Sequence, residues 1–342
     1  MSKFRVGITR DFLRADGTLG LGDIGLALLD LPHVEREFLI SSDGEIPPDV
    51  ADEYDALLVL APRVTERTVT GCKRLGLVAR FGVGYDTVDV PACTRHDVLL
   101  TITPDGVRRP VAVSALTLIL ALAHKLLIKD KLTRAGRWNE KLDHLGMGLA
   151  GRTLGVIGLG NIGREVFRVA LPLAMRHVGH DPFVGADQAA AMGVQWLVLD
   201  QLLAEADFVV ICCALTAETR RLIDARRLAL LKPTAYLINV ARGPIVDQAA
   251  LTAALQQRRI AGAGLDVFDP EPIDPRDPLL ALDNVILAPH ALCWTDECFL
   301  GNGRSACEAI LDYAAGRVPR HVVNRDVLDR PGMQAKLKRL AT

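Results

Sequence analysis

The feature that most constrains this chain is a glycine-rich turn between a short apolar run and a helical stretch. Residues 153–157 (TLGVI) have the length and composition of a strand buried on both faces, and residues 164–170 (REVFRVA) favour a helix. The intervening residues 158–163 (GLGNIG) match Gly-x-Gly-x-x-Gly. Glycines at these places permit a tight turn, close approach of a ligand to the backbone, and packing of the helix on the strand. The arrangement predicts a parallel α/β sheet with a helix N-terminus that can bind an anion.

An acidic residue follows this turn at the spacing typical of a dinucleotide site. Asp181 lies eighteen residues after Gly163, where the next strand is expected to end. A carboxylate there accepts hydrogen bonds from both hydroxyls of a ribose and repels a 2′-phosphate. The sequence therefore predicts NAD, rather than NADP, as the cofactor. Within the turn, the residues expected to contact it are Gly158, Gly160, Asn161, Ile162 and Gly163.

A second segment matches the same pattern but has a different context. Residues 20–25 (GLGDIG) follow the turn-forming residues 14–18 (RADGT) instead of an apolar strand, and Asp23 stands where a pyrophosphate would have to approach. The pattern alone is weak evidence, so its surroundings decide. We predict that residues 20–25 form a loop without cofactor contact, within a segment, residues 10–30, that resembles nothing we can place.

The alternation of apolar runs with helical stretches predicts parallel sheets with helices on both faces, and the length of 342 residues suits two domains. We expect strands at residues 3–9, 56–60, 76–79, 152–157, 194–198, 208–213, 235–240, 262–267 and 285–287. We expect helices at residues 111–128, 248–257 and 295–315, and a loop at residues 266–278. The predicted fold class is α/β, with two Rossmann-like doubly wound parallel-sheet domains. These domains are residues 1–109 plus 297–342, a discontinuous outer domain, and residues 110–296, a continuous central domain.

The composition disfavours several classes of function. Forty basic residues balance forty-one acidic ones without a long charged run, so no nucleic-acid partner is expected. The apolar stretch 111–128 contains His124 and Lys125 and is predicted to be a buried helix, so no membrane partner is expected. Seven cysteines without a CxxC pair, behind an N-terminus that lacks an apolar leader core, indicate a reduced, cytoplasmic location. His290 and Cys293 would make only half of a metal site, so no metal is expected.

Three ionisable residues follow three of the later predicted strands. Arg242, Glu271 and His290 each come directly after, or within a few residues of, an apolar run. In open α/β sheets, ligands bind at the carboxyl ends of the strands. Reduction of a carbonyl requires a proton donor, and histidine titrates near neutrality. A carboxylate beside the imidazole favours its protonated form, and an arginine can hold a substrate carboxylate. The three residues together predict hydride transfer at an alcohol carbon.

With these motifs, the chain resembles the D-isomer-specific 2-hydroxyacid dehydrogenases from about residue 50 to 325. The gaps of 29 residues from Arg242 to Glu271 and of 19 from Glu271 to His290 are similar to the spacing in that family. The motifs that carry the resemblance are residues 158–163 (GLGNIG), 239–243 (NVARG), 264–268 (GLDVF), 270–272 (PEP) and 288–290 (APH).

The resemblance implies an NAD-dependent oxidoreductase that transfers hydride between the nicotinamide and C2 of a small D-2-hydroxy acid or 2-oxo acid. It implies that His290 is the acid/base, that Glu271 raises its proton affinity, and that Arg242 binds the carboxylate and carbonyl. It further implies that the outer domain binds the substrate, that the central domain binds NAD, and that the chain forms a homodimer through the central domain, including the 111–150 arm. Additional cofactor contacts are expected from Cys213, Thr216, Ala241, Asp266 and His290. Additional substrate contacts are expected from Val83, Gly84 and Trp294.

The chain departs from the family pattern at several places. Ala112-Val113 stands where relatives usually have Ala-Glu, and Ala214 replaces a common proline. These departures leave the subfamily open, with substrates such as glyoxylate, hydroxypyruvate, phosphohydroxypyruvate or pyruvate, and also phosphite. Formate is disfavoured because the formate-specific enzymes resemble a variant without the partner that Glu271 supplies. Two alternatives are an NAD-sensing corepressor-like binding module on the same fold and an inactive paralogue.

Overall fold

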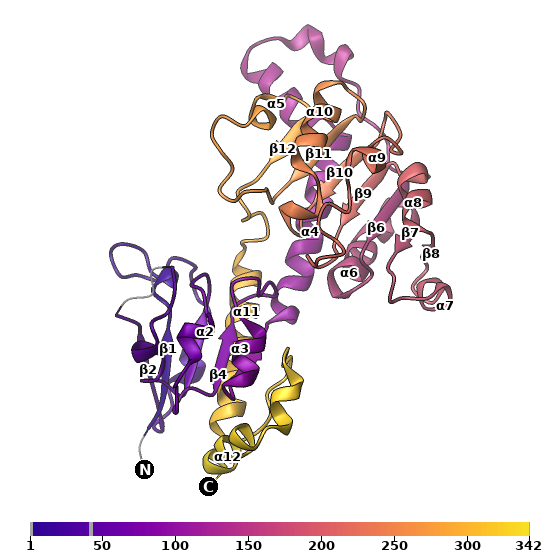
Figure 1. Ribbon diagram of the computed structural model, residues 1–342. Coiled ribbons are helices and arrows are strands. Elements are labelled where there is room, and N and C mark those ends of the chain that lie inside the picture. Colours follow the sequence, from indigo (N-terminus) through magenta and orange to yellow (C-terminus); the bar gives the residue numbers. More distant parts are fainter. Residues whose placement is uncertain (1–2, 41–43, 342) are drawn as a thin grey trace. The chain divides into compact units, whose positions relative to one another are not determined.

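The computed structural model describes residues 3–40 and 44–341, and these residues form two compact units (Figure 1). The first unit comprises Met1–Val107 and Trp294–Thr342, and the second comprises Arg108–Cys293. The outer unit is thus discontinuous in sequence. Its boundaries lie two and three residues from those expected, and residues 1, 2, 41–43 and 342 of the expected outer domain lie outside the described residues.

The first unit contains a five-stranded parallel sheet of order β2-β1-β3-β4-β5. Its strands are β1 (Phe4–Ile8), β2 (Val34–Phe38), β3 (Ala56–Val59), β4 (Leu77–Arg80) and β5 (Leu99–Thr101). Its helices are η1 (Arg10–Phe12), η2 (Leu26–Leu29), α1 (Pro48–Ala51), α2 (Glu66–Val69), α3 (Val90–Arg95), α11 (Asp296–Ala314), η7 (Arg325–Asp329) and α12 (Pro331–Leu340). The chain reverses direction across the sheet after β2, which is the doubly wound arrangement that the sequence predicted.

The second unit contains a seven-stranded parallel sheet of order β12-β11-β10-β9-β6-β7-β8. Its strands are β6 (Thr153–Ile157), β7 (Arg176–His180), β8 (Gln195–Trp196), β9 (Phe208–Ile211), β10 (Tyr236–Asn239), β11 (Gly262–Leu265) and β12 (Val285–Leu287). Its helices are α5 (Leu126–Arg134), η3 (Trp138–His144), α6 (Asn161–Ala170), η4 (Leu171–Leu173), α7 (Ala186–Ala190), α8 (Leu199–Glu205), α9 (Ala225–Leu228), η5 (Gly243–Ile245), α10 (Gln248–Gln256) and η6 (Pro278–Ala281). The order reverses between β7 and β9, on either side of β6, so the crevice for a ligand is expected at the end of β6.

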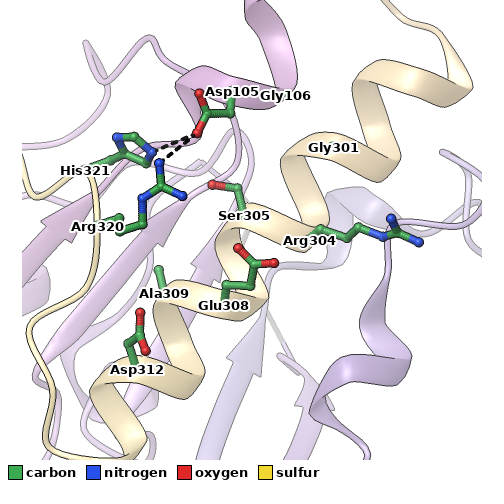
Figure 2. A pocket seen from close by; sticks show the side chains of 10 residues that line it. All are labelled: Asp105, Gly106, Gly301, Arg304, Ser305, Glu308, Ala309, Asp312, Arg320 and His321. Atoms are coloured by element: carbon green, nitrogen blue, oxygen red, sulfur yellow. Dashed lines mark hydrogen bonds and ion pairs between the residues drawn. The ribbon is translucent and has the colours of Figure 1, made fainter.

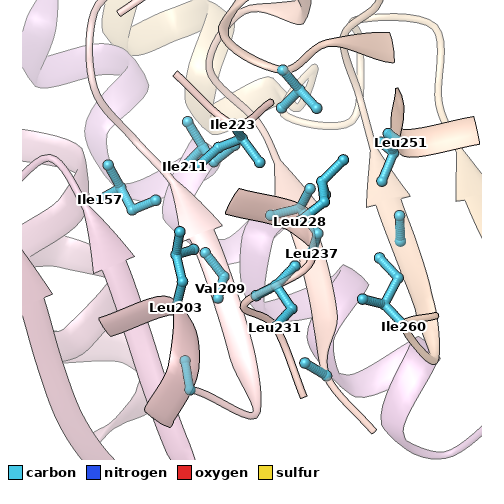
Figure 3. Packing of buried hydrophobic residues seen from close by; sticks show 14 of the residues in the cluster. Ile157, Leu203, Val209, Ile211, Ile223, Leu228, Leu231, Leu237, Leu251 and Ile260 are labelled. Atoms are coloured by element: carbon cyan, nitrogen blue, oxygen red, sulfur yellow. The ribbon is translucent and has the colours of Figure 1, made fainter. Parts of the chain in front are cut away.

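The sheet of the second unit is buried because helices cover both of its faces. Every residue of β6, β9, β10 and β11 is buried, which explains why these strands are continuous apolar runs without alternation. Figure 3 shows side chains of β6, β9 and β10 meeting those of neighbouring helices. Each fully buried leucine or isoleucine in such a layer stabilises the fold by about 2 kcal/mol. The residues labelled there are Ile157, Leu203, Val209, Ile211, Ile223, Leu228, Leu231, Leu237, Leu251 and Ile260.

The long apolar helix differs from its predicted bounds. We expected residues 111–128, but α4 spans Pro104–Ala123, and α5 begins only at Leu126. Pro110 lies inside α4, at its seventh residue, so the helix continues past it with one backbone hydrogen bond fewer. Lys125 adopts a left-handed φ of 52°, which ends the helical path between α4 and α5. By length and composition α4 alone among the described helices could cross a membrane, but 61% of its most apolar window is buried inside the protein.

Two strands were missed and one was predicted too long. β2, at the edge of its sheet, has three consecutive charged residues between two apolar ones, and β5 has only three residues, so neither shows a continuous apolar run. The predicted strand 194–198 is reduced to two residues in β8. Segment 10–30 is a loop with two short 3-10 helices and an isolated antiparallel bridge between Leu13 and Leu19. It buries Phe12, Ile24 and Leu29 completely, so it is part of the core of the first unit.

Candidate active site

The glycine-rich turn joins β6 to α6, and each of its three glycines has a separate reason to be glycine. Gly158 has a φ of +96°, and a Cβ there would lie 2.6 Å from the backbone nitrogen of Cys213. A Cβ at Gly163 would lie 2.0 Å from the carbonyl oxygen of Gly158. Around Gly160, in contrast, no described atom lies within 4 Å of a Cβ position, and the residue is exposed. The turn is thus packed at both ends and open in the middle, which fits the close approach of a pyrophosphate to the backbone.

The first residues of α6 complete this end of the sheet. Asn161 is exposed at the helix N-terminus, whereas the side chain of Ile162 packs against the core of the second unit. Ile162 therefore has only its backbone to offer to a ligand. The first N–H groups of a helix lack intrahelical acceptors and carry a partial positive charge, so they suit a phosphate. The residues of the turn fit the pyrophosphate of a dinucleotide.

Asp181 follows β7, the neighbour of β6, and its carboxylate is already tied to the turn. Its Oδ2 accepts the N–H of Leu159 at 2.8 Å, and its Oδ1 accepts the N–H of Phe183 at 2.8 Å. Each carboxylate oxygen has a second lone pair, so both remain able to accept a ribose hydroxyl. Trp196 donates its indole N–H to the carbonyl oxygen of Asp181 at 3.2 Å and fixes the strand end. Sequence reasoning found Asp181 but not Trp196, for which the sequence has no signal.

Cys213 and Thr216 lie after β9, on the other side of β6. Cys213 is half-buried, and its backbone contacts the turn at Gly158. Burial raises the pKa of the Cys213 thiol to about 11, so the thiol is neutral near pH 7. Thr216 is exposed in a local turn in which its N–H donates to the Thr219 hydroxyl at 2.7 Å. The predicted cofactor residues thus come together at the ends of the adjacent strands β7, β6 and β9.

Arg242 follows β10, and Asn239 at the end of that strand shapes its loop. The Asn239 side chain accepts the N–H of Ala241 at 3.1 Å and donates to the carbonyl oxygen of Arg242 at 2.9 Å. Gly243 allows the loop to lie against the next connection, since a Cβ there would be 1.8 Å from the carbonyl oxygen of Phe268. Asn239 is a positioning residue that sequence reasoning did not single out. A polar residue at the end of an otherwise apolar buried strand was the available signal.

Glu271 and His290 form a hydrogen-bonded pair at the carboxyl ends of β11 and β12. The Oε2 of Glu271 lies 2.8 Å from Nδ1 of His290, and its Oε1 accepts the N–H of Phe268 at 2.9 Å. His290 has a left-handed φ of 54°, a backbone conformation that costs a non-glycine residue energy and is found disproportionately at functional sites. Since Nδ1 is occupied by Glu271, Nε2 is the nitrogen that remains for a substrate.

The electrostatics of the pair favour a charged imidazole. The hydrogen bond to Glu271 raises the pKa of His290, against an opposing effect of burial and of the Arg242 charge. Burial works to raise the pKa of Glu271, but the hydrogen bonds from His290 and from the Phe268 N–H outweigh it, so the pKa of Glu271 is lowered. The pair therefore stabilises imidazolium beside carboxylate, which is the state that can donate a proton.

Asp266 follows β11 and acts on the backbone next to His290. Its Oδ1 accepts the N–H groups of Ala291 at 3.0 Å and of Leu292 at 3.2 Å, and its Oδ2 lies 3.2 Å from the same Leu292 nitrogen. Burial raises the pKa of the Asp266 carboxyl. The structure thus gives Asp266 a positioning role for the loop that carries His290, and its expected contact with the nicotinamide stays a prediction.

An apolar cavity of about 540 Å³ adjoins the Glu271–His290 pair within the second unit. Apart from the pair, its lining is apolar. The lining residues are Phe268, Glu271, Pro272, Ile273, Leu280, Leu287, Ala288, Pro289 and His290.

The remaining predicted substrate residues lie in the first unit. Val83 and Gly84 are half-buried in the turn that follows β4, next to Gly82, whose φ is 120°. Trp294 is 54% exposed and meets the ring of Phe299 edge-on, with 5.6 Å between ring centroids. Their contacts with a substrate stay predictions. Among the residues that the structure describes, no group of three His, Cys, Asp or Glu side chains is arranged to hold a metal ion.

Comparisons with known proteins give relatives over most of the chain. The model of the NAD binding domain of the D-isomer specific 2-hydroxyacid dehydrogenases matches residues 116–291. A glyoxylate reductase of Thermococcus onnurineus is 38% identical over 314 residues, which are 89% of this chain and 91% of that protein. The crystal structure of the TT0316 protein from Thermus thermophilus has a TM-score of 0.80 at 32% identity, covering 94% of this chain and 100% of that one. D-lactate dehydrogenase from Aquifex aeolicus, complexed with NAD and lactic acid, has a TM-score of 0.81 at 26% identity, covering 93% and 99%.

Proposed function

Because this chain belongs to the D-isomer-specific 2-hydroxyacid dehydrogenase family, we propose that it interconverts a small 2-oxo acid, of the size of glyoxylate or hydroxypyruvate, with its 2-hydroxy acid. The enzyme class, an NAD-dependent D-2-hydroxyacid dehydrogenase, and the cofactor NAD(H) follow from the family. The residues of the turn at 158–163 and Asp181 would hold the cofactor, which supplies or accepts the hydride at C2. Two of its relatives are named glyoxylate reductases, which supports a small substrate.

The observation that carries this proposal is the 2.8 Å hydrogen bond between Glu271 Oε2 and His290 Nδ1. During reduction, Nε2 of the protonated His290 donates a proton to the carbonyl oxygen of the substrate while C2 gains the hydride. During oxidation, the neutral Nε2 takes the proton of the hydroxyl group. Glu271 keeps the ring oriented and its proton affinity high throughout, without itself becoming protonated.

Arg242 has the chemistry to bind the rest of a 2-oxo acid. Its guanidinium is close enough to the Glu271–His290 pair to affect the pKa of both residues. An arginine presents several N–H donors in one plane, so it can hold a carboxylate by two parallel hydrogen bonds and polarise a neighbouring carbonyl. We assign Arg242 to the substrate carboxylate and carbonyl oxygen. Val83, Gly84 and Trp294 are further candidates for substrate contact, on the resemblance alone.

The proposal is tested by the oxidation of NADH and NADPH, measured in parallel, with glyoxylate, hydroxypyruvate, pyruvate, longer 2-oxo acids and 3-phosphohydroxypyruvate. We expect turnover with NADH, fastest with a small substrate. If the phosphorylated or the longer acids are turned over best, the proposed substrate size is wrong. If no 2-oxo acid reacts although NADH binds, the reaction itself is wrong, and oxidation of phosphite and cofactor sensing become the next hypotheses to test.

We further propose that the protein is a cytoplasmic homodimer. All seven cysteines are free, as in reducing compartments. The segment from α5 to the start of β6 exposes large apolar side chains, with Trp138 64%, Leu142 73% and Leu145 71% exposed. Such an apolar patch is typical of a surface that a partner covers. A second copy is the partner that the family resemblance implies.

Light scattering coupled to size-exclusion chromatography tests this assembly. We expect the mass of two chains for the natural protein and of one chain for Leu142→Glu, because a buried unpaired carboxylate opposes association. The variant Leu171→Glu, at a similarly exposed leucine (64%) elsewhere in the second unit, serves as the matched control and should stay dimeric. A monomeric natural protein would refute the proposal.

A further inference from the structure

A second cavity lies within the first unit and has no place in the proposed reaction. It has a volume of about 260 Å³ and lies between the start of α4, the middle of α11 and the segment after α11 (Figure 2). Charged side chains of both signs make up much of its lining, whereas the cavity beside His290 is apolar apart from one pair. Figure 2 shows Arg320 and Glu308 turned toward the space beside Ser305, whereas Arg304 extends away from it. The side chains that matter for its chemistry are Asp105, Ser305, Glu308, Asp312, Arg320 and His321.

Two of the three acids in this cavity already have partners. Asp105 Oδ2 lies 3.1 Å from Nε2 of His321 and 3.5 Å from Nη2 of Arg320. Asp312 pairs with Arg317, with 2.7 Å between Oδ1 and Nη2. Glu308, in contrast, accepts no hydrogen bond from any residue that the structure describes. Glu308 is thus the anionic group available to a ligand.

On the cationic side of the cavity, the Arg320 guanidinium also has donor hydrogens left for a ligand. Within the described part of the chain, the Arg320 guanidinium bonds to Asp105 alone, at a distance that makes a weak bond, although arginine has five donor hydrogens. The hydroxyl group of Ser305 lies between Arg320 and Glu308 (Figure 2). A plain anion would meet three carboxylates here, and a plain cation would meet arginine. A small ligand that carries one charge of each sign satisfies both sides.

The cavity adjoins the place where the first turn of α4, which belongs to the first unit, touches α11 through the backbone. A Cβ at Gly106 of α4 would lie 2.3 Å from the backbone nitrogen of Asn302, and one at Gly301 of α11 would lie 2.9 Å from the Cα of Gly106. Gly106 and Gly301 are both part of the cavity wall. These two helices are also the segments by which the chain leaves and re-enters the first unit, after Val107 and before Trp294.

Buried hydrogen bonds connect this crossing to the turn that follows β4. The hydroxyl of Thr103 donates to Oδ1 of Asn302 at 2.8 Å and accepts the N–H of Gly82 at 2.7 Å. The N–H of Thr103 also donates to the carbonyl oxygen of Gly82 at 2.9 Å. Thr103 is 1% and Asn302 3% exposed, so water cannot replace these bonds. Gly82 directly precedes Val83 and Gly84, the predicted carboxylate contacts. These bonds are a direct physical link between the crossing and that turn.

We propose that this cavity binds a small zwitterion of the α-amino-acid class, with the carboxylate at Arg320 and the ammonium group at Glu308, and that its binding changes the KM for the 2-oxo acid. The second part rests on the proposed function, but the first does not. A 2-oxo acid lacks the ammonium group, so the substrate itself is a poor ligand for this cavity. Ion pairs at a site this open are individually weak, so a dissociation constant on the order of 1 mM is expected.

Binding is tested by titration calorimetry of the full chain with glycine, L-alanine, D-alanine and L-serine. We expect saturable binding of at least one of them, weakened ten-fold or more in Glu308→Gln and in Arg320→Met. The variant Arg304→Met removes a cation that points away and should bind like the natural protein. Sodium acetate and methylammonium chloride carry the two charges separately and should bind more weakly. No saturable heat with any amino acid, equally tight binding of acetate or methylammonium, or unchanged binding in both variants would each overturn the assignment.

The coupling is tested by measuring the KM for glyoxylate with and without the amino acid that binds. We expect a change of about three-fold or more in the natural protein. Thr103→Val, which removes the hydroxyl, should still bind the amino acid but lose the change in KM, whereas Thr103→Ser should keep both. A constant KM in the natural protein despite binding, or an equal change in Thr103→Val, would overturn the coupling. If no 2-oxo acid is turned over, the calorimetry still decides whether the cavity binds, so the two proposals fail separately.

Discussion

The Gly-x-Gly-x-x-Gly segments at residues 20–25 and 158–163 lie in different units, and their surroundings differ. In the second unit, residues 158–163 join a buried strand to a helix and leave Gly160 open to a ligand. In the first unit, residues 20–25 pack on α11, where a Cβ at Gly303 would lie 1.8 Å from the carbonyl oxygen of Ile24. Gly25, with a φ of 72°, rests on the side chain of Arg304. The same pattern is therefore left open in one unit and packs against a helix in the other.

Among the described residues, each unit also has one histidine–carboxylate pair in which the histidine backbone is left-handed. His290 binds Glu271 at 2.8 Å and His321 binds Asp105 at 3.1 Å, and both histidines have a left-handed φ, of 54° and 58°. His290 stands at the carboxyl edge of the seven-stranded sheet, close to Arg242 and Asp266. His321 instead ties the segment after α11 to the start of α4. A glycine motif or a histidine with a left-handed backbone therefore does not identify a catalytic site by itself. Its position relative to the carboxyl ends of the strands must also be known.

The largest expected effect concerns the two histidines. His290→Ala should lower kcat by roughly two to four powers of ten, because the imidazole is the proposed donor of the proton. His321→Ala should cost at least a hundred-fold less. Steady-state turnover of NADH with the best 2-oxo acid measures both. Equal losses in the two variants would break the comparison and remove His290 from the mechanism.

The two glycine segments should also respond differently when one of their glycines is replaced by alanine. Gly160→Ala meets no steric conflict in the protein but puts a methyl where the pyrophosphate approaches, so the KM for NADH should rise roughly ten-fold, about 1.4 kcal/mol of binding free energy. Gly22→Ala, at a φ of 73° in open space, should lower the free energy of unfolding by about 1 kcal/mol and leave the KM unchanged. Cofactor kinetics and urea unfolding of both variants provide the test. A raised KM in Gly22→Ala would assign the first segment to the cofactor.

One aspartate is associated with each glycine segment, Asp181 with residues 158–163 and Asp23 with residues 20–25, and the two should respond differently to substitution. Asp181→Ala should reduce the preference for NADH over NADPH by about ten-fold, since a charged acceptor for the ribose hydroxyls is lost. It should also raise the KM for NADH, because Asp181 holds the N–H of Leu159 in the turn. Asp23→Ala removes only a local bond to the N–H of Gly25 and should leave the preference as it is. An unchanged ratio in Asp181→Ala would refute the ribose assignment.

The smallest expected effect is a displacement of the pH profile. Because Glu271 raises the pKa of His290, the rate of reduction should stay high above pH 6.5 and fall as the pH rises through the raised pKa. Glu271→Gln removes the negative charge, so the fall in the rate of reduction should occur at lower pH. The dependence of kcat/KM for the 2-oxo acid on pH gives the pH at which the rate falls. If that pH is unchanged or higher in the variant, Glu271 does not raise the pKa of His290.

Part of the site follows from sequence because parallel sheets gather strand ends. Arg242, Glu271 and His290 stand after apolar runs, and such runs become neighbouring strands whose carboxyl ends share one edge. The supporting residues do not follow in this way. Asn239 and Trp196 act through backbone atoms of other loops, so their roles depend on distances that no spacing in the sequence contains.

The sequence by itself determined the class of fold and the glycine-rich turn between a buried strand and a helix, and it predicted the three ionisable residues at strand ends, because these depend on local patterns of apolar residues and glycines. Only the tertiary structure decided that residues 20–25 pack on α11, that α4 begins at Pro104, and that Asp266 anchors the loop of His290. It also brought Asp105 to Arg320, more than two hundred residues away, in one charged cavity. Such contacts depend on where the folded chain places distant backbones, and local sequence carries no record of that.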